Sequence, residues 1–438
     1  MVIAGCVTAA VAAVVAGTLA FGKFNGEERP AGADSKAGPT ASPAGDRTQS
    51  RALLKVPPTP HEEDESNSAE GSWVTSRTYA SGAVFGVLGY DLDSGKQTWK
   101  VPLDGDLCAA SRDVTSGGLV AVVFTGSKSD DSKCSEIAVI DIDQGRKVWQ
   151  KSMPEATRGL DLGVGVSEDF AAVGWPYGQS WGFDVHSGRT VWDSPPAGCG
   201  SEEYQGLKTL MGIAYCDDRL VVMKRDPRTG EASRFVTLPE ALHTAYIASA
   251  DPLVVAGYAG DEEYPLDANR LLTFGEDGSL KATVEIDDYV PGCRNGEGCG
   301  AVVAGEDTVY VASKKKGMSS GNHIAAFDAN TGRRKWTVDG VSRSQVLPLR
   351  ADEDGLIAYS NAGVNRDGSG VIHLAAADAK QTLLLRQPNG FEVSNSTSQL
   401  ARPGMRDPVL YEDGRLFFHR ASVSYSNTLP MSYAFTIR

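Results

Sequence analysis

The chain has 438 residues, of which 41% are hydrophobic and 22% charged, which is the composition of an ordinary globular protein. Its formal net charge of −14 argues against nucleic-acid binding through a basic surface and favours an acidic, soluble exterior. None of its seven cysteines forms a C-x-x-C pair, so zinc-knuckle and thioredoxin-like sites lack support.

The chain opens on an uncharged apolar run, MVIAGCVTAAVAAVVAGTLAF, which is about long enough to cross a bilayer. We therefore predict a transmembrane anchor over residues 1–22. Two alternatives stay open: a cleaved signal peptide, although a basic n-region is missing, and a lipoprotein box at IAGC with Cys6 as the lipid site. The missing basic flank also suggests that the natural start lies upstream of Met1.

Residues 23–71 are dominated by Gly, Pro, Ala, Ser and charged side chains, which bury too little apolar area to offset chain entropy. We predict a disordered linker there. One short patch inside it, RALLKVP at residues 51–57, has the alternation of a strand.

From residue 72 onward one short phrase recurs four times, as YDLDSGKQTW, IDIDQGRKVW, FDVHSGRTVW and FDANTGRRKW. Each copy has an Asp, a Gly four residues later and a Trp four residues after that. The Asp and Gly are typical of a tight turn, and the Trp on the following strand can wedge against a neighbouring unit. The motif residues are Asp91, Gly95, Trp99, Asp141, Gly145, Trp149, Asp184, Gly188, Trp192, Asp328, Gly332 and Trp336.

Weaker copies align on residues 226, 274, 378 and 436, which gives eight units of forty to sixty residues with short strands in each. This period predicts an all-β, eight-bladed propeller of four-stranded antiparallel blades over residues 72–438. The eighth unit lacks an outer strand, and residues 51–57 are the predicted donor that closes the ring. A seven-bladed ring is the alternative.

The sequence AFDANTGRRKW (Ala326 to Trp336) matches the repeat of the pyrroloquinoline-quinone-like (PQQ-like) β-propellers, and the other copies resemble it closely. The resemblance covers about residues 72–438. It is greatest to the non-enzymatic branch that includes the outer-membrane assembly propeller lipoprotein, and to membrane-anchored bacterial propellers outside the cell. It implies a single-pass membrane protein whose propeller is a binding or sensor scaffold outside the cytoplasm.

The six cysteines of the body form an even set, which indicates disulfides and an oxidising compartment. In a propeller blade, the start of the first strand and the loop between strands two and three lie at the same face. This geometry predicts the pairs Cys108–Cys134 and Cys199–Cys216. Cys293 and Cys299 share a single entry loop and are the third predicted pair, and all three lie on one face.

No catalytic, cofactor-binding or metal-binding residues are predicted, and the protein is expected not to be an enzyme. The quinone dehydrogenases of the superfamily stack their cofactor under a disulfide of adjacent cysteines, and no two cysteines are adjacent here. A Gly-x-Ser-x-Gly match at residues 317–321 falls in a polar loop rather than in the strand-to-helix elbow that it requires. A quinone-dependent oxidoreductase remains the alternative function.

The disulfide face carries the long, unlike loops, and varied loops on a rigid ring are where recognition usually resides. We therefore expect an unidentified protein or cell-envelope ligand to dock there, around the channel mouth of a monomeric propeller, with no nucleic acid involved. The candidate contacts are Glu262, Glu263, Tyr264, Lys315 and Tyr425.

Overall fold

A computed structural model describes residues 47–58, 66–129, 132–157, 162–175, 179–261, 267–294, 298–315, 321–340, 344–362, 368–401, 409–424 and 429–438. The chain divides into two compact units, Met1–Gly45 and Asp46–Arg438. The first unit, which contains the predicted anchor and Cys6, lies outside the described residues. Within the described residues, no helix is both long and apolar enough to span a membrane.

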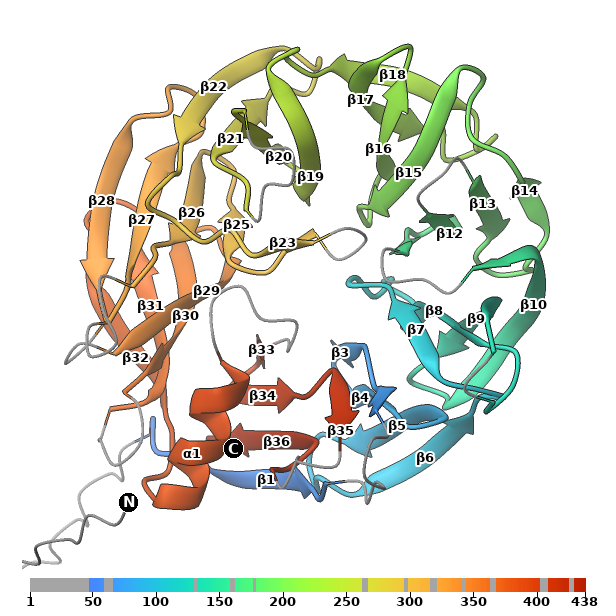
Figure 1. Cartoon of the computed structure of the whole chain (residues 1–438). Coiled ribbons are helices and arrows are strands. Elements are labelled where there is room, and N and C mark those ends of the chain that lie inside the picture. Colours follow the sequence, from blue (N-terminus) through green and yellow to red (C-terminus); the bar gives the residue numbers. More distant parts are fainter. Residues whose placement is uncertain are drawn as a thin grey trace, which may run out of the picture. The chain divides into compact units, whose positions relative to one another are not determined.

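The second unit forms a ring of eight four-stranded antiparallel sheets, which confirms the predicted eight-bladed propeller (Figure 1). The seven-bladed alternative is therefore wrong. The middle strands of the blades are buried at nearly every position, so each blade buries both faces against its neighbours and the core is divided among the gaps between blades.

Blades 1 to 4 consist of these strands, from the inner to the outer one: β3 (Ser72–Val74), β4 (Thr78–Ala83), β5 (Gly86–Asp91), β6 (Gln97–Pro102); β7 (Leu107–Ala110), β8 (Leu119–Thr125), β9 (Cys134–Asp141), β10 (Arg146–Thr157); β11 (Gly163–Val166), β12 (Phe170–Trp175), β13 (Gln179–Asp184), β14 (Thr190–Trp192); β15 (Cys199–Gln205), β16 (Met211–Cys216), β17 (Arg219–Arg225), β18 (Ala232–Thr237).

Blades 5 to 8 follow in the same order: β19 (Leu242–Ala250), β20 (Leu253–Ala259), β21 (Arg270–Phe274), β22 (Leu280–Glu285); β25 (Val302–Ala304), β26 (Thr308–Ala312), β27 (His323–Asp328), β28 (Arg334–Asp339); β29 (Gln345–Ala351), β30 (Gly355–Asn361), β31 (Gly370–Ala375), β32 (Gln381–Arg386); β33 (Val409–Glu412), β34 (Arg415–His419), β36 (Ser432–Thr436), β1 (Arg51–Val56). The helix α1 (Phe391–Leu400) lies between blades 7 and 8, and β2 (Ser66–Ser68) pairs with β35 (Ser422–Ser424).

Blade 8 is completed by the N-terminal strand. β1 pairs with β36 from Arg51↔Thr436 to Val56↔Ser432, so the outer strand comes from the patch that the sequence singled out. Leu54 is buried with Tyr79 and Phe417 between blades 8 and 1. The first and last strands of the ring are therefore neighbours in one sheet.

Two parts of the predicted disordered linker are ordered. Ser50 donates its backbone N–H and its hydroxyl to the carbonyl of Arg386 at the end of β32. Residues 66–70 form β2 and bury Ala69. The prediction of disorder at these positions is wrong. Ser50 directly precedes the closing strand, and residues 57–71 connect the outer strand of blade 8 to the inner strand of blade 1, which composition does not show.

The repeated phrase forms the turn between the third and fourth strands. In the copy at Asp328, the carboxylate accepts the backbone N–H groups of Asn330 and Thr331, and Gly332 adopts a φ of 70°. The hydroxyl of Thr331, which donates to the same carboxylate at 2.9 Å, and then these backbone N–H groups lower the pKa of Asp328. Equivalent hydroxyl and backbone bonds within the turn lower the pKa of Asp91, Asp184 and Asp226.

Two weak copies of the turn differ from the sequence alignment. In blade 7 the residue with positive φ is Ala379, whose N–H donates to the carbonyl of Ala375, so Ala375 rather than Asp378 holds the place of the motif Asp. In blade 5 the turn is shorter and closes with the N–H of Gly278 donating to Gly275. Aligning the repeats on their Asp therefore gave the wrong turn residues in blades 5 and 7, where other residues form the turn.

The motif Trp wedges between blades, as the sequence predicted. A Cβ built on Gly145 of blade 2 would lie 2.3 Å from Cγ of Trp99 in blade 1, and one built on Gly188 would lie 2.7 Å from Cδ2 of Trp149. Trp336 donates its indole N–H to the carbonyl of Ala376 in the next blade, at 2.9 Å. The phrase is therefore a blade-packing motif in which the turn of one blade receives the Trp of the preceding one.

We expect Gly145→Ala to lower the free energy of unfolding by about 1–2 kcal/mol, because Gly145 has a φ of 66° and its Cβ position is occupied by Trp99. Gly117→Ala is the matched control, since the nearest atom to its built Cβ is 3.8 Å away. Urea denaturation of both variants checks this. If the two variants were equally stable, the contact of Trp99 would not restrict the residue at position 145.

Candidate functional site

Three disulfides join the predicted cysteine pairs, with Cα–Cα distances of 6.1 Å for Cys108–Cys134, 4.0 Å for Cys199–Cys216 and 3.8 Å for Cys293–Cys299. Cys108 and Cys199 lie at the start of first strands, Cys134 begins a third strand and Cys216 ends a second one. Cys293 and Cys299 lie in the connection from blade 5 to blade 6. We call this side of the ring the disulfide face, made of the blade-to-blade connections and the loops between second and third strands. The opposite side, which bears the Asp–Gly turns, is the turn face.

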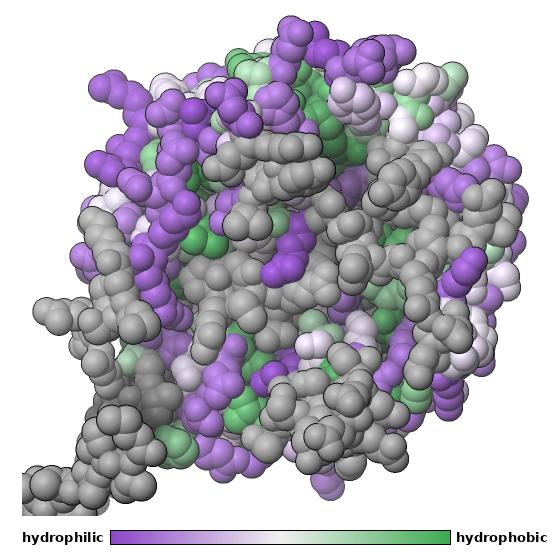
Figure 2. All heavy atoms as spheres, in the orientation of Figure 1, coloured by the Kyte–Doolittle hydropathy of each residue, from purple (hydrophilic) through white to green (hydrophobic). Residues whose placement is uncertain are grey.

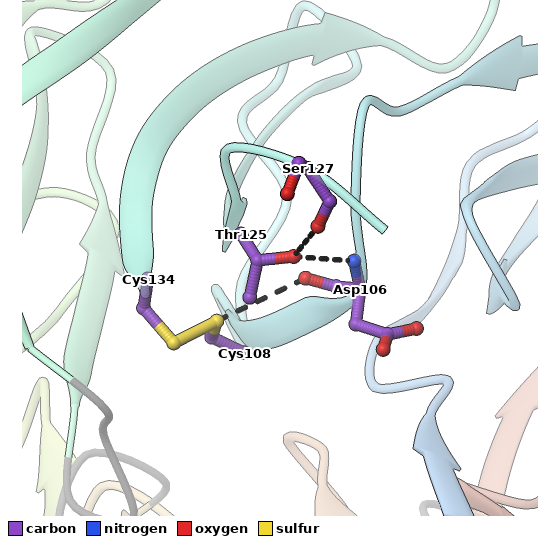
Figure 3. The surroundings of a disulfide bond; sticks show 5 residues. All are labelled: Asp106, Cys108, Thr125, Ser127 and Cys134. Atoms are coloured by element: carbon purple, nitrogen blue, oxygen red, sulfur yellow. Dashed lines mark hydrogen bonds between the residues drawn. A yellow bond between two sulfur atoms is a disulfide. The ribbon is translucent and has the colours of Figure 1, made fainter. Parts of the chain in front are cut away.

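A network of polar contacts holds the disulfide of blade 2 (Figure 3). The hydroxyl of Thr125 accepts the N–H of Asp106 at 2.8 Å and donates to the carbonyl of Ser127 at 2.7 Å. Asn67, beside the ring-closing connection, donates its amide to the carboxylate of Asp106 at 2.7–2.8 Å. The disulfide of blade 2 is thus joined to the segment that follows the closing strand.

A short hairpin, β23 (Cys293–Arg294) and β24 (Gly298–Cys299), reaches into the middle of the ring (Figure 1). It leads into blade 6, yet Arg112 of blade 2, on the opposite side of an eight-membered ring, donates Nη1 to the carbonyl of Cys299 at 3.2 Å. Gln205 of blade 4 also contacts it: its side-chain oxygen accepts the N–H of Gly298 at 2.7 Å in the amide orientation that satisfies both groups.

This hairpin is the feature of the site that sequence reasoning missed. The two cysteines and the Gly-rich stretch PGCRNGEGCG indicated a small closed loop. They did not show the direction in which it projects, because that depends on Arg112 and Gln205, which are far away in the chain. The approach at Gly298 is so close that a built Cβ would lie 2.1 Å from the amide of Gln205.

Charged groups surround the hairpin. Burial raises the pKa of Asp267, while the charges of Lys314 and Arg294 oppose the shift. Burial likewise raises the pKa of Asp113, against the charge of the neighbouring Arg112. Carboxylates and cations so arranged can bind charged groups of a ligand, but these contacts include no pairing of a nucleophile with a base.

The structure places one of the five candidate contact residues. Lys315 is exposed on the disulfide face, after β26, and interacts with other groups there. Glu262, Glu263, Tyr264 and Tyr425 lie outside the described residues. Their assignment to a common docking surface therefore stays a prediction.

The disulfide face is in front in Figures 1 and 2, where α1 and β23 lie toward the viewer. Figure 2 shows that hydrophilic residues predominate around the rim of this face, with smaller hydrophobic areas between them.

On the turn face, several charged or polar groups pair with one another across blade boundaries. Arg77 of blade 1 contacts Asp143 of blade 2 at 2.9 Å, and Arg350 of blade 7 contacts Glu412 of blade 8 at 2.8 Å. Other pairs across blades are Ser116–Glu168, Lys208–Asp251 and Arg415–Asp93. These contacts hold the ring together and leave fewer turn-face charges for a partner.

The disulfides of this chain differ from the one under which, by the resemblance, the dehydrogenases stack their quinone cofactor. The disulfides join cysteines 26, 17 and 6 positions apart rather than adjacent ones. Across the described ranges, no group of three His, Cys, Asp or Glu side chains is arranged to hold a metal ion.

Comparisons with known proteins show one likeness of fold. A search of curated proteins found no significant match. Among solved structures, the computationally designed Ika8 protein has a TM-score of 0.54 at 12% identity, covering 88% of this chain and 99% of that one, which shows likeness of fold alone. BamB from Moraxella catarrhalis has a TM-score of 0.48 at 13% identity, covering 86% of this chain and 99% of that one.

The quinohemoprotein alcohol dehydrogenase ADHIIG from Pseudomonas putida HK5 has a TM-score of 0.49 at 12% identity, covering 88% of this chain and 80% of that one. The family model for the outer membrane protein assembly factor BamB matches residues 42–204, which include the closing strand and the first three blades. That match covers part of the chain, and the repeated turn and the eight four-stranded blades are similar to those of the PQQ-like β-propellers.

Proposed function

We propose that this protein is a membrane-anchored, extracytoplasmic propeller that serves as a binding or sensor scaffold for another protein or a cell-envelope ligand, with no catalysis of its own. The single observation that carries the proposal is the contrast between the two faces of the ring. Several charged groups on the turn face pair between blades, whereas the disulfide face presents loops of unlike length and charge.

Three further observations support the proposal. Three disulfides are typical of proteins in oxidising compartments outside the cytoplasm. The uncharged run over residues 1–22 has the length of a membrane anchor. Disulfides near the loop bases pre-order the disulfide face, which lowers the entropy cost of docking a partner.

The proposal predicts that charge reversal on the disulfide face weakens binding of the partner and that the same change on the turn face does not. The disulfide-face variant combines Glu262→Lys, Glu263→Lys and Lys315→Glu. The turn-face control combines Lys96→Glu and Arg189→Glu, two exposed side chains. We expect at least about a tenfold loss of affinity in the first variant, or about 1.4 kcal/mol.

The measurement uses the full chain in its native cells. Cross-linking and mass spectrometry with the wild type first identify the partner, and recovery of that same partner is then compared between the variants. Circular dichroism of both variants shows whether the propeller stays folded. If only the turn-face variant lost the partner, the binding surface would lie on the turn face and the proposal would be wrong.

A further inference from the structure

An exposed Asn–Gly pair lies where the chain leaves blade 7. Asn389 and Gly390 are both exposed, directly before α1. Within the described residues, Asn389 makes no side-chain hydrogen bond, and the N–H of Gly390 donates none. A Cβ built on Gly390 would meet no atom within 4 Å, so the space around its backbone nitrogen is open.

Four other asparagines of the described residues differ from Asn389 in their hydrogen bonds and in the residue that follows. The amides of Asn67, Asn269, Asn322 and Asn395 take part in hydrogen bonds. Each is followed by a residue with a side chain, which hinders approach of the next backbone nitrogen to the amide carbon. The chain contains three Asn–Gly pairs, and Asn389–Gly390 is the one that lies within the described residues.

We propose that Asn389 is a site of spontaneous, non-enzymatic deamidation. The backbone nitrogen of Gly390 loses its proton to hydroxide and attacks the side-chain carbonyl carbon of Asn389. The new C–N bond closes a succinimide ring, and the side-chain amide leaves as ammonia. Water then opens the ring at either carbonyl, which yields aspartate or isoaspartate. The step consumes one water in total and needs neither an oxidant nor an enzyme.

Glycine is the residue that permits this reaction best, because it has no Cβ to block the attack and its backbone reaches most conformations. Exposed loops with small and polar residues are also the parts of a protein most open to such change. Both conditions hold at Asn389–Gly390.

The product would alter the start of α1 on the disulfide face. The carbonyl of Gly390 accepts the N–H of Ser394 at 2.9 Å in the first turn, and the side chain of Glu392 contacts Lys55 of the closing strand. Aspartate at position 389 adds a negative charge near the positive end of the helix. Isoaspartate inserts an extra backbone carbon before Gly390, which displaces that carbonyl from the first turn.

The test is incubation of the folded full chain at mildly alkaline pH, followed by peptide mass spectrometry. We expect the peptide containing Asn389 to gain the mass that replaces an amide NH2 by OH, at a rate that rises with hydroxide concentration. An isoaspartate-specific methyltransferase used as a probe should label the same peptide. The peptides of Asn67, Asn269 and Asn322 serve as internal controls and should keep their amides.

The variant Asn389→Gln should lose the mass change and the methyl label while keeping the circular dichroism spectrum of the wild type. The chain unfolded in urea provides the reference for an unhindered Asn–Gly pair. If Asn389 deamidates in urea but keeps its amide in the folded protein over the same period, the fold protects this site and the proposal is overturned.

Discussion

We expect deletion of residues 47–56 to destabilise the propeller by several kcal/mol, because it removes the outer strand of blade 8 and exposes the edge of β36. A single substitution probes the same closure. Leu54→Ala should lower the free energy of unfolding by about 2–4 kcal/mol, since Leu54 is 6% exposed and packs with Tyr79 and Phe417.

Urea denaturation followed by tryptophan fluorescence measures both effects. Arg51→Ala in the same strand is the control, because Arg51 is exposed and should change stability by no more than about 0.5 kcal/mol. A synthetic peptide of residues 47–58 added to the deletion variant should restore part of the lost stability. Unfolding of the deletion variant at the wild-type urea concentration would mean that β1 does not contribute to ring closure.

The second large effect concerns His419, which is fully buried in β34 at the seam between blades 8 and 1. Its Nε2 lies 2.6 Å from the carbonyl of Ala69, and its Nδ1 lies 3.0 Å from the hydroxyl of Ser432. Desolvation lowers its pKa from 6.5 to about 4, and the nearby charge of Arg420 acts in the same direction. The folded protein therefore keeps this imidazole neutral.

In the unfolded chain His419 takes up a proton below its ordinary pKa of 6.5, whereas in the folded chain it does so only near 4. Between these values unfolding binds a proton, so acid favours the unfolded state. The stability that the neutral His419 contributes is complete above pH 6.5 and falls by about 3 kcal/mol as the pH drops toward 4.

The measurement is the free energy of unfolding from urea denaturation at several pH values between 7.5 and about 4. Because other groups also titrate, the quantity to compare is the difference between wild type and His419→Gln, a variant that does not titrate there. This difference should shrink steadily as the pH falls below 6.5. A difference that stays constant over the whole range would show that His419 titrates alike in the folded and unfolded chain.

Much of the fold could be predicted because the blade-packing motif is local. Asp, Gly and Trp act within a few residues of one another, so the copies ending at Trp99, Trp149, Trp192 and Trp336 identify their blades directly. The missing strand of the eighth unit predicted the role of residues 51–56, because an unpaired sheet edge must be covered by something.

The parts that could not be predicted depend on contacts distant in sequence. Composition marked residues 66–70 as linker, although Ala69 is buried and its carbonyl pairs with His419. The cysteine spacing predicted the Cys293–Cys299 pair, but only the positions of Arg112 and Gln205 show that this hairpin reaches across the ring. The varied loops of the disulfide face carry no repeating pattern from which their contacts could be inferred.

The pairing of β1 with β36 also sets the timing of folding during synthesis. β1 is the first blade strand that the ribosome makes, and its partner, β36 (Ser432–Thr436), is the last. Every nascent chain must therefore hold an apolar strand without its partner until the final residues have been delivered. The ring closes in one late step, and any chain released before that step remains an open arc with two unpaired edges.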